Sequence, residues 1–228
     1  MSVEIVNGSQ LSSDLEDIAD AIRAKTGSSA PIPYTVGDPS NFINAIASIP
    51  SFEPSIDGVQ FNAEGIRLPF TLNANHRVKV DFFVDEYKVN MNIVGNTANN
   101  YQRFHLTQYN NKYYTTGSPS YDIIITASLT GRHTYDFNTN SNIKFDDVVV
   151  VDNQGNPITI APETYSTIYY TIGFRNTVDF TGKIYRFTIW DNTDDSLVCD
   201  LQAYGKNGDA DCLYDVVNDK IYVPQKRS

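Results

Sequence analysis

Aromatic and amide side chains gather in one short stretch of this 228-residue chain, residues 101–114, which reads Tyr-Gln-Arg-Phe-His-Leu-Thr-Gln-Tyr-Asn-Asn-Lys-Tyr-Tyr. A sugar ring presents an apolar face and a rim of hydroxyls, so exposed tyrosines beside amides or an arginine supply both stacking and directional hydrogen bonds. The stretch therefore predicts a carbohydrate-binding patch made of Arg103, Tyr109, Asn110, Asn111, Tyr113 and Tyr114. A second interpretation stays open, in which alternate aromatics lie in the core and the Asn-Asn pair is only a hairpin turn.

Two acidic loops near the C-terminus carry the oxygen ligands that calcium prefers. The first contains Asp191, Asp194 and Asp195, and the second contains Asp209 and Asp211. The alternative is that these residues form turns in which each side chain bonds to its own backbone. The spacing also differs from that of an EF-hand. Calcium is the one cofactor that the sequence leaves open, and no other is expected.

Catalytic patterns are absent from the sequence. A retaining glycosidase needs two carboxyls about 5 Å apart, which alternate positions of one strand would supply. The nearest acidic groupings, Asp81 with Asp85 and Glu86, and Asp146 with Asp147, do not alternate in this way. The three histidines lie in alternating segments without a Gly-x-Ser-x-Gly elbow, and phosphate-binding glycine loops are missing. The sequence predicts a protein that is not an enzyme.

The charge balance narrows the class of ligand. Seventeen basic against 27 acidic residues give a net charge of -10, and basic residues do not cluster. Nucleic acid is therefore a poor partner. A neutral glycan, a protein receptor or a cation-bridged anionic ligand fits better than direct attraction to an anionic polymer. No stretch approaches the roughly 18 apolar residues that span a bilayer, and no signal peptide is recognisable, so we expect cytoplasmic synthesis without membrane insertion.

The first fifty residues predict a small α-helical module. One helix is expected from Ser13 to Thr26 and a shorter one from Asp38 to Ile49, where Pro39 marks the first helical position. Two short helices cannot bury enough apolar surface alone, so they must pack on each other, on the rest of the chain or on other copies. The helical stripe suggests a homo-oligomer, specifically a three-fold bundle, formed through Leu11, Leu15, Ile18 and Ile22.

The remaining residues, 51–228, predict an antiparallel β-sandwich. Ser51 to Asp57 reads as a linker, and about a dozen strand-like runs follow without intervening helices. Cys199 and Cys212 flank a turn and are interpreted as two free buried thiols, because cytoplasmic synthesis disfavours disulfides.

Three segments carry a family resemblance. Residues 182–223 contain Gly-Lys-Ile-Tyr-Arg-Phe-Thr-Ile-Trp-Asp, then Leu-Val-Cys-Asp-Leu, then Leu-Tyr-Asp-Val-Val-Asn-Asp-Lys-Ile-Tyr-Val. This cassette, together with Phe70 to Phe83, resembles concanavalin-like (laminin-G-like) jelly rolls found in tail and baseplate proteins of phages infecting Gram-positive bacteria. Leu15 to Gly27, followed by Phe42 to Ile46, is similar to a short N-terminal module of such tail proteins, where it serves attachment or assembly.

The resemblance implies a mainly β chain, an antiparallel jelly-roll β-sandwich over residues 51–228 with a helical attachment or oligomerisation module at 1–50. It implies a virion protein of the tail tip that recognises host surface carbohydrate without catalysis and contacts other tail or baseplate proteins. A structural baseplate component without a receptor of its own is the alternative, and a polysaccharide depolymerase is third.

Overall fold

The structure is a computed structural model, and the chain divides into two units, Met1–Ser51 and Phe52–Ser228. The residues that the structure describes all belong to the second unit: 52–97, 104–115, 123–138, 142–152, 154–158, 164, 166–173, 180–206 and 210–226. The predicted helices and the stripe of Leu11, Leu15, Ile18 and Ile22 lie outside these residues. The described part is mainly β, and it contains no helix.

The first sheet has ten antiparallel strands. Its order is β11-β10-β9-β4-β13-β14-β15-β16, with β1 paired to β14 and β2 paired to β13. Its strands are β1 (Phe52–Pro54), β2 (Val59–Asn62), β4 (His76–Val84), β9 (Gly131–Asn138), β10 (Lys144–Phe145), β11 (Val148–Val149), β13 (Thr181–Asp191), β14 (Ser196–Lys206), β15 (Cys212–Asp215) and β16 (Lys220–Tyr222).

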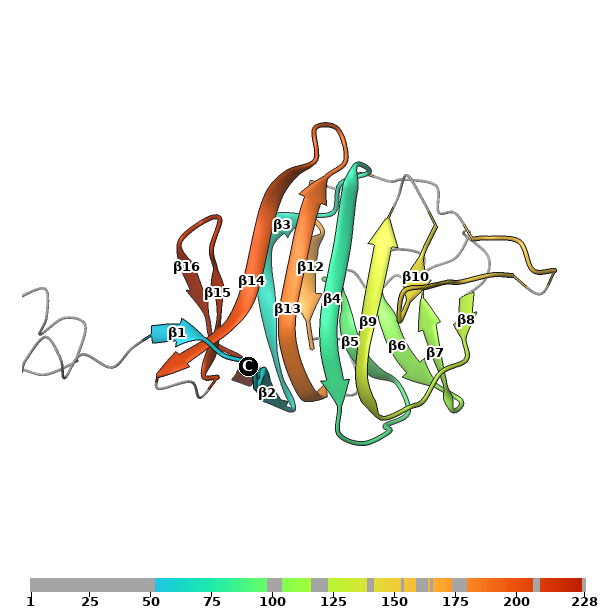
Figure 1. Cartoon of the computed structure of the whole chain (residues 1–228), viewed down its shortest axis with the longest axis horizontal. Helices are drawn as coiled ribbons and strands as arrows, with labels where there is room; N and C mark the ends of the chain where they lie inside the picture. Colours follow the sequence, from blue (N-terminus) through green and yellow to red (C-terminus); the bar gives the residue numbers. More distant parts are fainter. Residues whose placement is uncertain are drawn as a thin grey trace, which may run out of the picture. The chain divides into compact units, whose positions relative to one another are not determined.

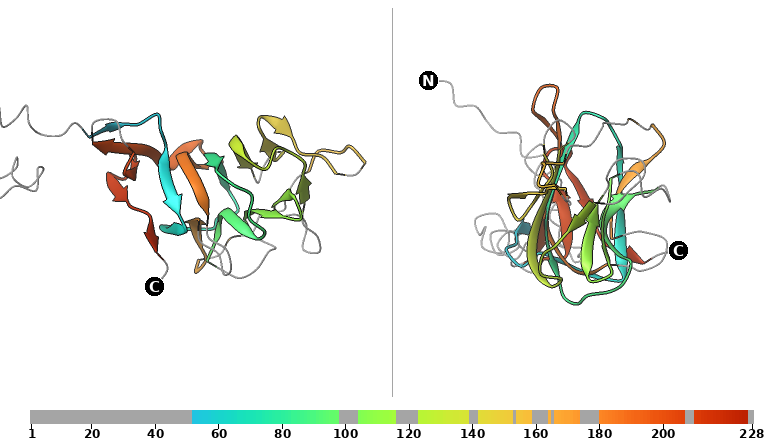
Figure 2. Two further views of the ribbon diagram at one scale, coloured as in Figure 1. Left: turned by 90° about the horizontal axis from the view of Figure 1, so that it is seen from below. Right: turned by 90° about the vertical axis from the view of Figure 1, so that its right-hand side faces the viewer.

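The second sheet has seven antiparallel strands in the order β17-β3-β12-β5-β6-β7-β8. They are β3 (Glu64–Thr71), β5 (Met91–Asn96), β6 (Leu106–Tyr109), β7 (Lys112–Thr115), β8 (Ile123–Ile125), β12 (Tyr169–Ile172) and β17 (Gln225–Lys226). Figure 1 shows the ten-stranded sheet in front of the other, and the right-hand view of Figure 2 shows the two layers from the side.

Strict alternation explains how the core forms between the layers. In β4 every second residue from His76 to Val84 is buried, and the residues between them are partly exposed. Side chains of a strand point to opposite faces in turn, so this pattern buries one face of the sheet. The buried Phe82 of β4 meets Tyr113 of the facing sheet at a ring separation of 6.4 Å. Burial of such aromatic rings supplies much of the stabilisation of the domain.

Two irregularities interrupt the pairing of β13 with its neighbours, one in β13 itself and one in β14. The register shifts between Ile184 and Arg186 against β4, and between Ile189 and Trp190 against β14. Ile184 and Ile189 are fully buried, whereas Trp190 is only partly buried and lies beneath the guanidinium of Arg77, 5.0 Å from its ring. Tyr185 is the extra residue of the first irregularity, so Ile184 and Phe187 both reach the core. Val198 of β14 is the extra residue of the second, and Trp190 faces away from the core because it alternates with Ile189.

Both cysteines are free and buried, as the sequence predicted. Cys212 pairs with Tyr204, five positions along β14 from Cys199. At about 3.3 Å per residue this separates the two Cα atoms by roughly 16 Å, more than the ~7 Å limit for a disulfide.

Candidate functional site

The hairpin of β6 and β7 presents the central part of the predicted patch. Tyr109 pairs with Lys112, so Asn110 and Asn111 form a two-residue turn. Their φ angles are 46° and 57°. Two consecutive left-handed residues define the type I′ turn that suits the twist of a hairpin, and asparagine tolerates this conformation. The hairpin interpretation of the Asn-Asn pair is confirmed, and the turn leaves both residues exposed.

Tyr109 and Tyr114 supply the aromatic surface of this hairpin. Their rings form an edge-to-face pair with centroids 5.6 Å apart. Tyr109 is 41% exposed and Tyr114 is partly exposed. Each ring restrains the other, so the pair offers an ordered apolar surface. Lys112, at the same end of β7, is exposed beside them.

Tyr113 points the opposite way and does not belong to the exposed patch. It is fully buried, and its ring contacts Phe82 and lies 4.9 Å from Phe145. Its hydroxyl donates to the carbonyl of Leu129 at 3.4 Å, and burial raises the pKa of Tyr113 to about 12. The prediction that Tyr113 contacts a ligand is corrected on this ground, because adjacent strand residues face opposite sides. Arg103 lies outside the described residues.

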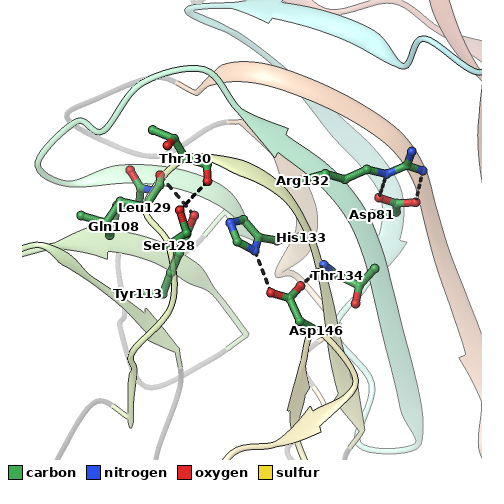
Figure 3. A network of polar contacts seen from close by, with 10 residues as sticks. All are labelled: Asp81, Gln108, Tyr113, Ser128, Leu129, Thr130, Arg132, His133, Thr134 and Asp146. Carbon is green, nitrogen blue, oxygen red and sulfur yellow. Dashed lines mark hydrogen bonds and ion pairs between the residues drawn. The ribbon is translucent and has the colours of Figure 1, made fainter.

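Gln108 ties this hairpin to two other loops. Its side chain is fully buried; Nε2 donates to the carbonyl of Leu129 at 2.6 Å, and Oε1 accepts the backbone N–H of Lys88 at 3.4 Å. Figure 3 shows Gln108 and Tyr113 converging on the segment 128–130. A buried amide whose donor and acceptor are both used holds its surroundings in one arrangement.

The loop between β4 and β5, residues 85–90, lies against the hairpin. Asn90 donates its backbone N–H to the carbonyl of Gln108 at 2.8 Å, and Asn111 donates its backbone N–H to the hydroxyl of Tyr87 at 3.0 Å. No sequence motif assigns this loop to the site. The loop contains the apolar Val89 followed by Asn90, and the structure exposes both.

The predicted calcium loops use their carboxylates in turns. Asp191 accepts the backbone N–H and the hydroxyl of Thr193, and Asp194 accepts the backbone N–H of Ser196 at 3.0 Å. Hydrogen bonds from Thr193 lower the pKa of Asp191. These contacts are those of turn-forming aspartates.

Of the other predicted calcium ligands, Asp195 takes a positive φ of 57°, Asp211 is exposed and Asp209 lies outside the described residues. Within the described ranges, no group of three or more His, Cys, Asp or Glu side chains is arranged to hold a metal ion.

Acidic residues on the outward face of the ten-stranded sheet are paired with arginines. Each of three arginines approaches an aspartate with two nitrogens at 2.6–3.0 Å: Arg77 with Asp136, Arg132 with Asp81, and Arg186 with Asp200. Arg132 also lies over the ring of Tyr185, 3.9 Å from its centroid. Two-point pairing of this kind is geometrically specific. This face is thus a polar wall whose charges are largely compensated.

The acidic pair Asp146-Asp147 forms the turn between β10 and β11, with φ angles of 50° and 61°. Asp146 accepts the backbone N–H of Thr134 and contacts Nδ1 of His133, both at 2.8 Å (Figure 3). The carboxylate therefore fastens this turn to β9. All three histidines, His76, His105 and His133, are buried.

No helix in the described part of the chain is long and apolar enough to cross a membrane. The fold and the site define a mainly β protein, built from two antiparallel sheets, with exposed aromatic and amide side chains at one end. No protein family model matches the sequence, and no curated protein matches it.

Proposed function

We propose that this chain is a non-catalytic adhesion protein of a phage or prophage tail tip, which binds carbohydrate on the host surface. The observation that carries the proposal is the pair Tyr109 and Tyr114, exposed beside the amides of Asn110 and Asn111. Stacking on a tyrosine ring and hydrogen bonds to amides are the two interactions that a sugar needs. The sequence resemblance to jelly rolls of phage tail proteins supplies the biological setting.

The fold proposed for residues 51–228 is a concanavalin-like jelly roll. Two antiparallel sheets with an aromatic core between them support this assignment. Residues 1–50 are proposed as a helical attachment module that assembles three copies. Trimerisation would multiply a weak contact with a repeating glycan, because linked sites bind with an increased effective concentration. The proposed location is the virion, in contact with other tail or baseplate proteins.

A structural baseplate component is the second candidate, and one observation favours it. The outward face of the ten-stranded sheet carries three compensated Arg–Asp pairs. Such a polar wall suits packing against neighbouring proteins. A polysaccharide depolymerase is the third candidate and would require two facing carboxylates in a cleft.

Binding to intact cells tests the proposal directly. Fluorescently labelled full-length protein is incubated with Gram-positive cells of several species, with and without calcium, while light scattering gives its mass in solution. The proposal expects saturable binding that periodate treatment of the cells abolishes, because periodate cleaves vicinal diols of sugars. A folded oligomer that binds no cell would favour the structural component.

A further inference from the structure

We propose that the loop of residues 85–90 forms the second half of the carbohydrate site, and that the composite site takes an uncharged pyranose. The sugar ring would lie on Tyr109, with its hydroxyls bonded to the amides of Asn90, Asn110 and Asn111. This inference rests on the proposed function and adds to it a second loop, a specificity-determining amide and a ligand class.

The two loops form one unit despite their separation in the sequence. The hydroxyl of Tyr87 accepts the backbone N–H of Asn111, across 24 positions of the chain. Gln108 receives two further hydrogen bonds from the loop, its carbonyl from Asn90 and its side-chain oxygen from Lys88. Both loops lie at the lower end of the domain in Figure 1. A site made of two mutually bonded loops is organised before its ligand arrives, which reduces the entropic cost of binding.

Three asparagine side chains of the two loops can form hydrogen bonds with a ligand. Asn90, Asn110 and Asn111 are exposed, and their side-chain amides make no hydrogen bond to other described residues. By contrast, the side-chain amides of Asn192 and Asn218 donate to Asn138 and to the Val198 carbonyl. Each free amide has two donors and an acceptor, the complement of a pair of neighbouring sugar hydroxyls.

Positive φ angles set these three side chains apart from ordinary strand residues. The φ angles of Asn90, Asn110 and Asn111 are 65°, 46° and 57°. A left-handed backbone fixes the direction in which each side chain leaves the chain. Val89, 48% exposed, adds apolar surface next to Asn90. The composite site thus combines an apolar surface with fixed polar groups, the composition typical of sites for small polar ligands.

The charges of the two loops favour an uncharged ligand. Glu86 is paired with Lys88 at 2.8 Å, and Asp85 accepts a hydrogen bond from Gln60 at 2.9 Å. Among the charged side chains of the two loops, only Lys112 has no polar partner within the described part of the chain. One lysine against the net charge of -10 on the whole chain gives little attraction for a polyanion.

Residue-resolved NMR of the isotope-labelled full-length chain tests this inference. The probes are glucose, galactose, rhamnose and N-acetylglucosamine, with glycerol phosphate as an anionic probe. We expect at least one uncharged sugar to shift the backbone amide signals of residues 86–90 and 109–112 together. Asn90→Ala should reduce the affinity for that sugar about tenfold, the usual effect of losing one hydrogen bond to a ligand. Asn62→Ala, which removes an exposed amide at the end of β2, is the matched control and should leave affinity unchanged.

The possible failures are distinguishable. Shifts confined to residues 109–114, with unchanged affinity in Asn90→Ala, overturn the two-loop site and leave carbohydrate binding intact. Shifts caused by glycerol phosphate in place of the sugars overturn the uncharged class. If no probe shifts either loop, the composite site is wrong, and the cell-binding experiment decides separately whether the proposed function survives.

Discussion

The side-chain amide of Gln108 donates to the carbonyl of Leu129 at 2.6 Å, and the same side chain accepts the backbone N–H of Lys88. One buried residue of the hairpin thereby fastens the β4–β5 loop and the segment before β9 to the candidate site. The arrangement explains how two exposed loops keep a defined geometry at the ends of their strands.

Replacing this amide should destabilise the domain. Gln108→Leu removes the buried amide that bonds the carbonyl of Leu129 and the backbone N–H of Lys88, and the loss of these two hydrogen bonds is expected to cost about 1–3 kcal/mol of unfolding free energy. Urea denaturation of the full-length protein measures the change. Gln225→Leu, an exposed glutamine in β17, is the control and should change stability by less than about 0.5 kcal/mol. Equal stability of Gln108→Leu and the unmodified chain would contradict the buried bridging role.

Substitution of Tyr113 should affect stability, whereas substitution of Tyr109 should affect sugar binding. Tyr113→Ala removes a fully buried ring and is expected to cost about 3–5 kcal/mol, as for other large-to-small core changes. Tyr109→Ala removes a ring that is 41% exposed, so we expect a loss below about 1 kcal/mol with loss of sugar binding. Thermal and urea unfolding measure the first effect. A larger loss of stability in Tyr109→Ala than in Tyr113→Ala would reverse the assignment of faces.

Acidification should weaken the fold through His76. Burial lowers its pKa below the usual 6.5, against the opposing attraction of Asp191. The unfolded chain therefore binds more protons as the pH falls below about 6.5, and stability decreases in that range. His76→Gln removes this titration, so its unfolding free energy should fall less steeply between pH 6.5 and 5. Urea denaturation at several pH values checks the slope, and identical slopes would refute the assignment to His76.

Protonation of Asp200 should cause a second loss of folding stability at lower pH. Burial opposes its ionisation, but hydrogen bonds from Arg186, Gln202 and Thr188 outweigh burial and lower its pKa. A carboxyl with a lowered pKa stabilises the fold above the unfolded value near 4, and this stability disappears as the pH falls through the folded value. Asp200→Asn should therefore be less stable at pH 7 and should lose less stability on acidification to pH 3. A parallel pH dependence of the two proteins would exclude this contribution.

The two thiols should be unreactive in the folded protein. Burial is the main cause that raises the pKa of Cys212 to about 11, and burial followed by the charge of Asp215 raises the pKa of Cys199. Because the thiolate is the reactive form, an aromatic disulfide reagent at pH 8 should label neither residue until the chain is unfolded in urea. Rapid reaction of one equivalent in the native state would show that one thiol is accessible.

Sequence reasoning predicts the strands better than the faces they present. Strict alternation from His76 to Val84 specifies both the strand and its buried side, and the Asn-Asn pair specifies its turn. Alternation around Tyr113 and Tyr114 divides the aromatics into two sets, but it does not tell which set faces the core. The second sheet decides that question, since Phe82 packs on Tyr113.

Bulges and long-range contacts account for the other differences. The extra residue Tyr185 lets Ile184 and Phe187 of β13 both face the core, and a local pattern does not reveal where such a bulge falls. The last turn spans Val216 to Asp219, where Asp215 accepts the backbone N–H groups of Val217 and Asn218. The contact of Tyr87 with Asn111 joins loops far apart in the sequence, so only the folded structure brings the β4–β5 loop into the site.

A paired variant experiment on whole cells tests whether the Tyr109 surface binds carbohydrate. Tyr109→Ala is compared with Tyr214→Ala, which breaks a similar edge-to-face pair, Tyr204 with Tyr214, with ring centroids 5.0 Å apart on the ten-stranded sheet. We predict that Tyr109→Ala reduces periodate-sensitive cell binding at least tenfold, while Tyr214→Ala binds as the unmodified protein does. Full binding by Tyr109→Ala, with its fold confirmed by circular dichroism, would show that the Tyr109 surface does not bind the host carbohydrate.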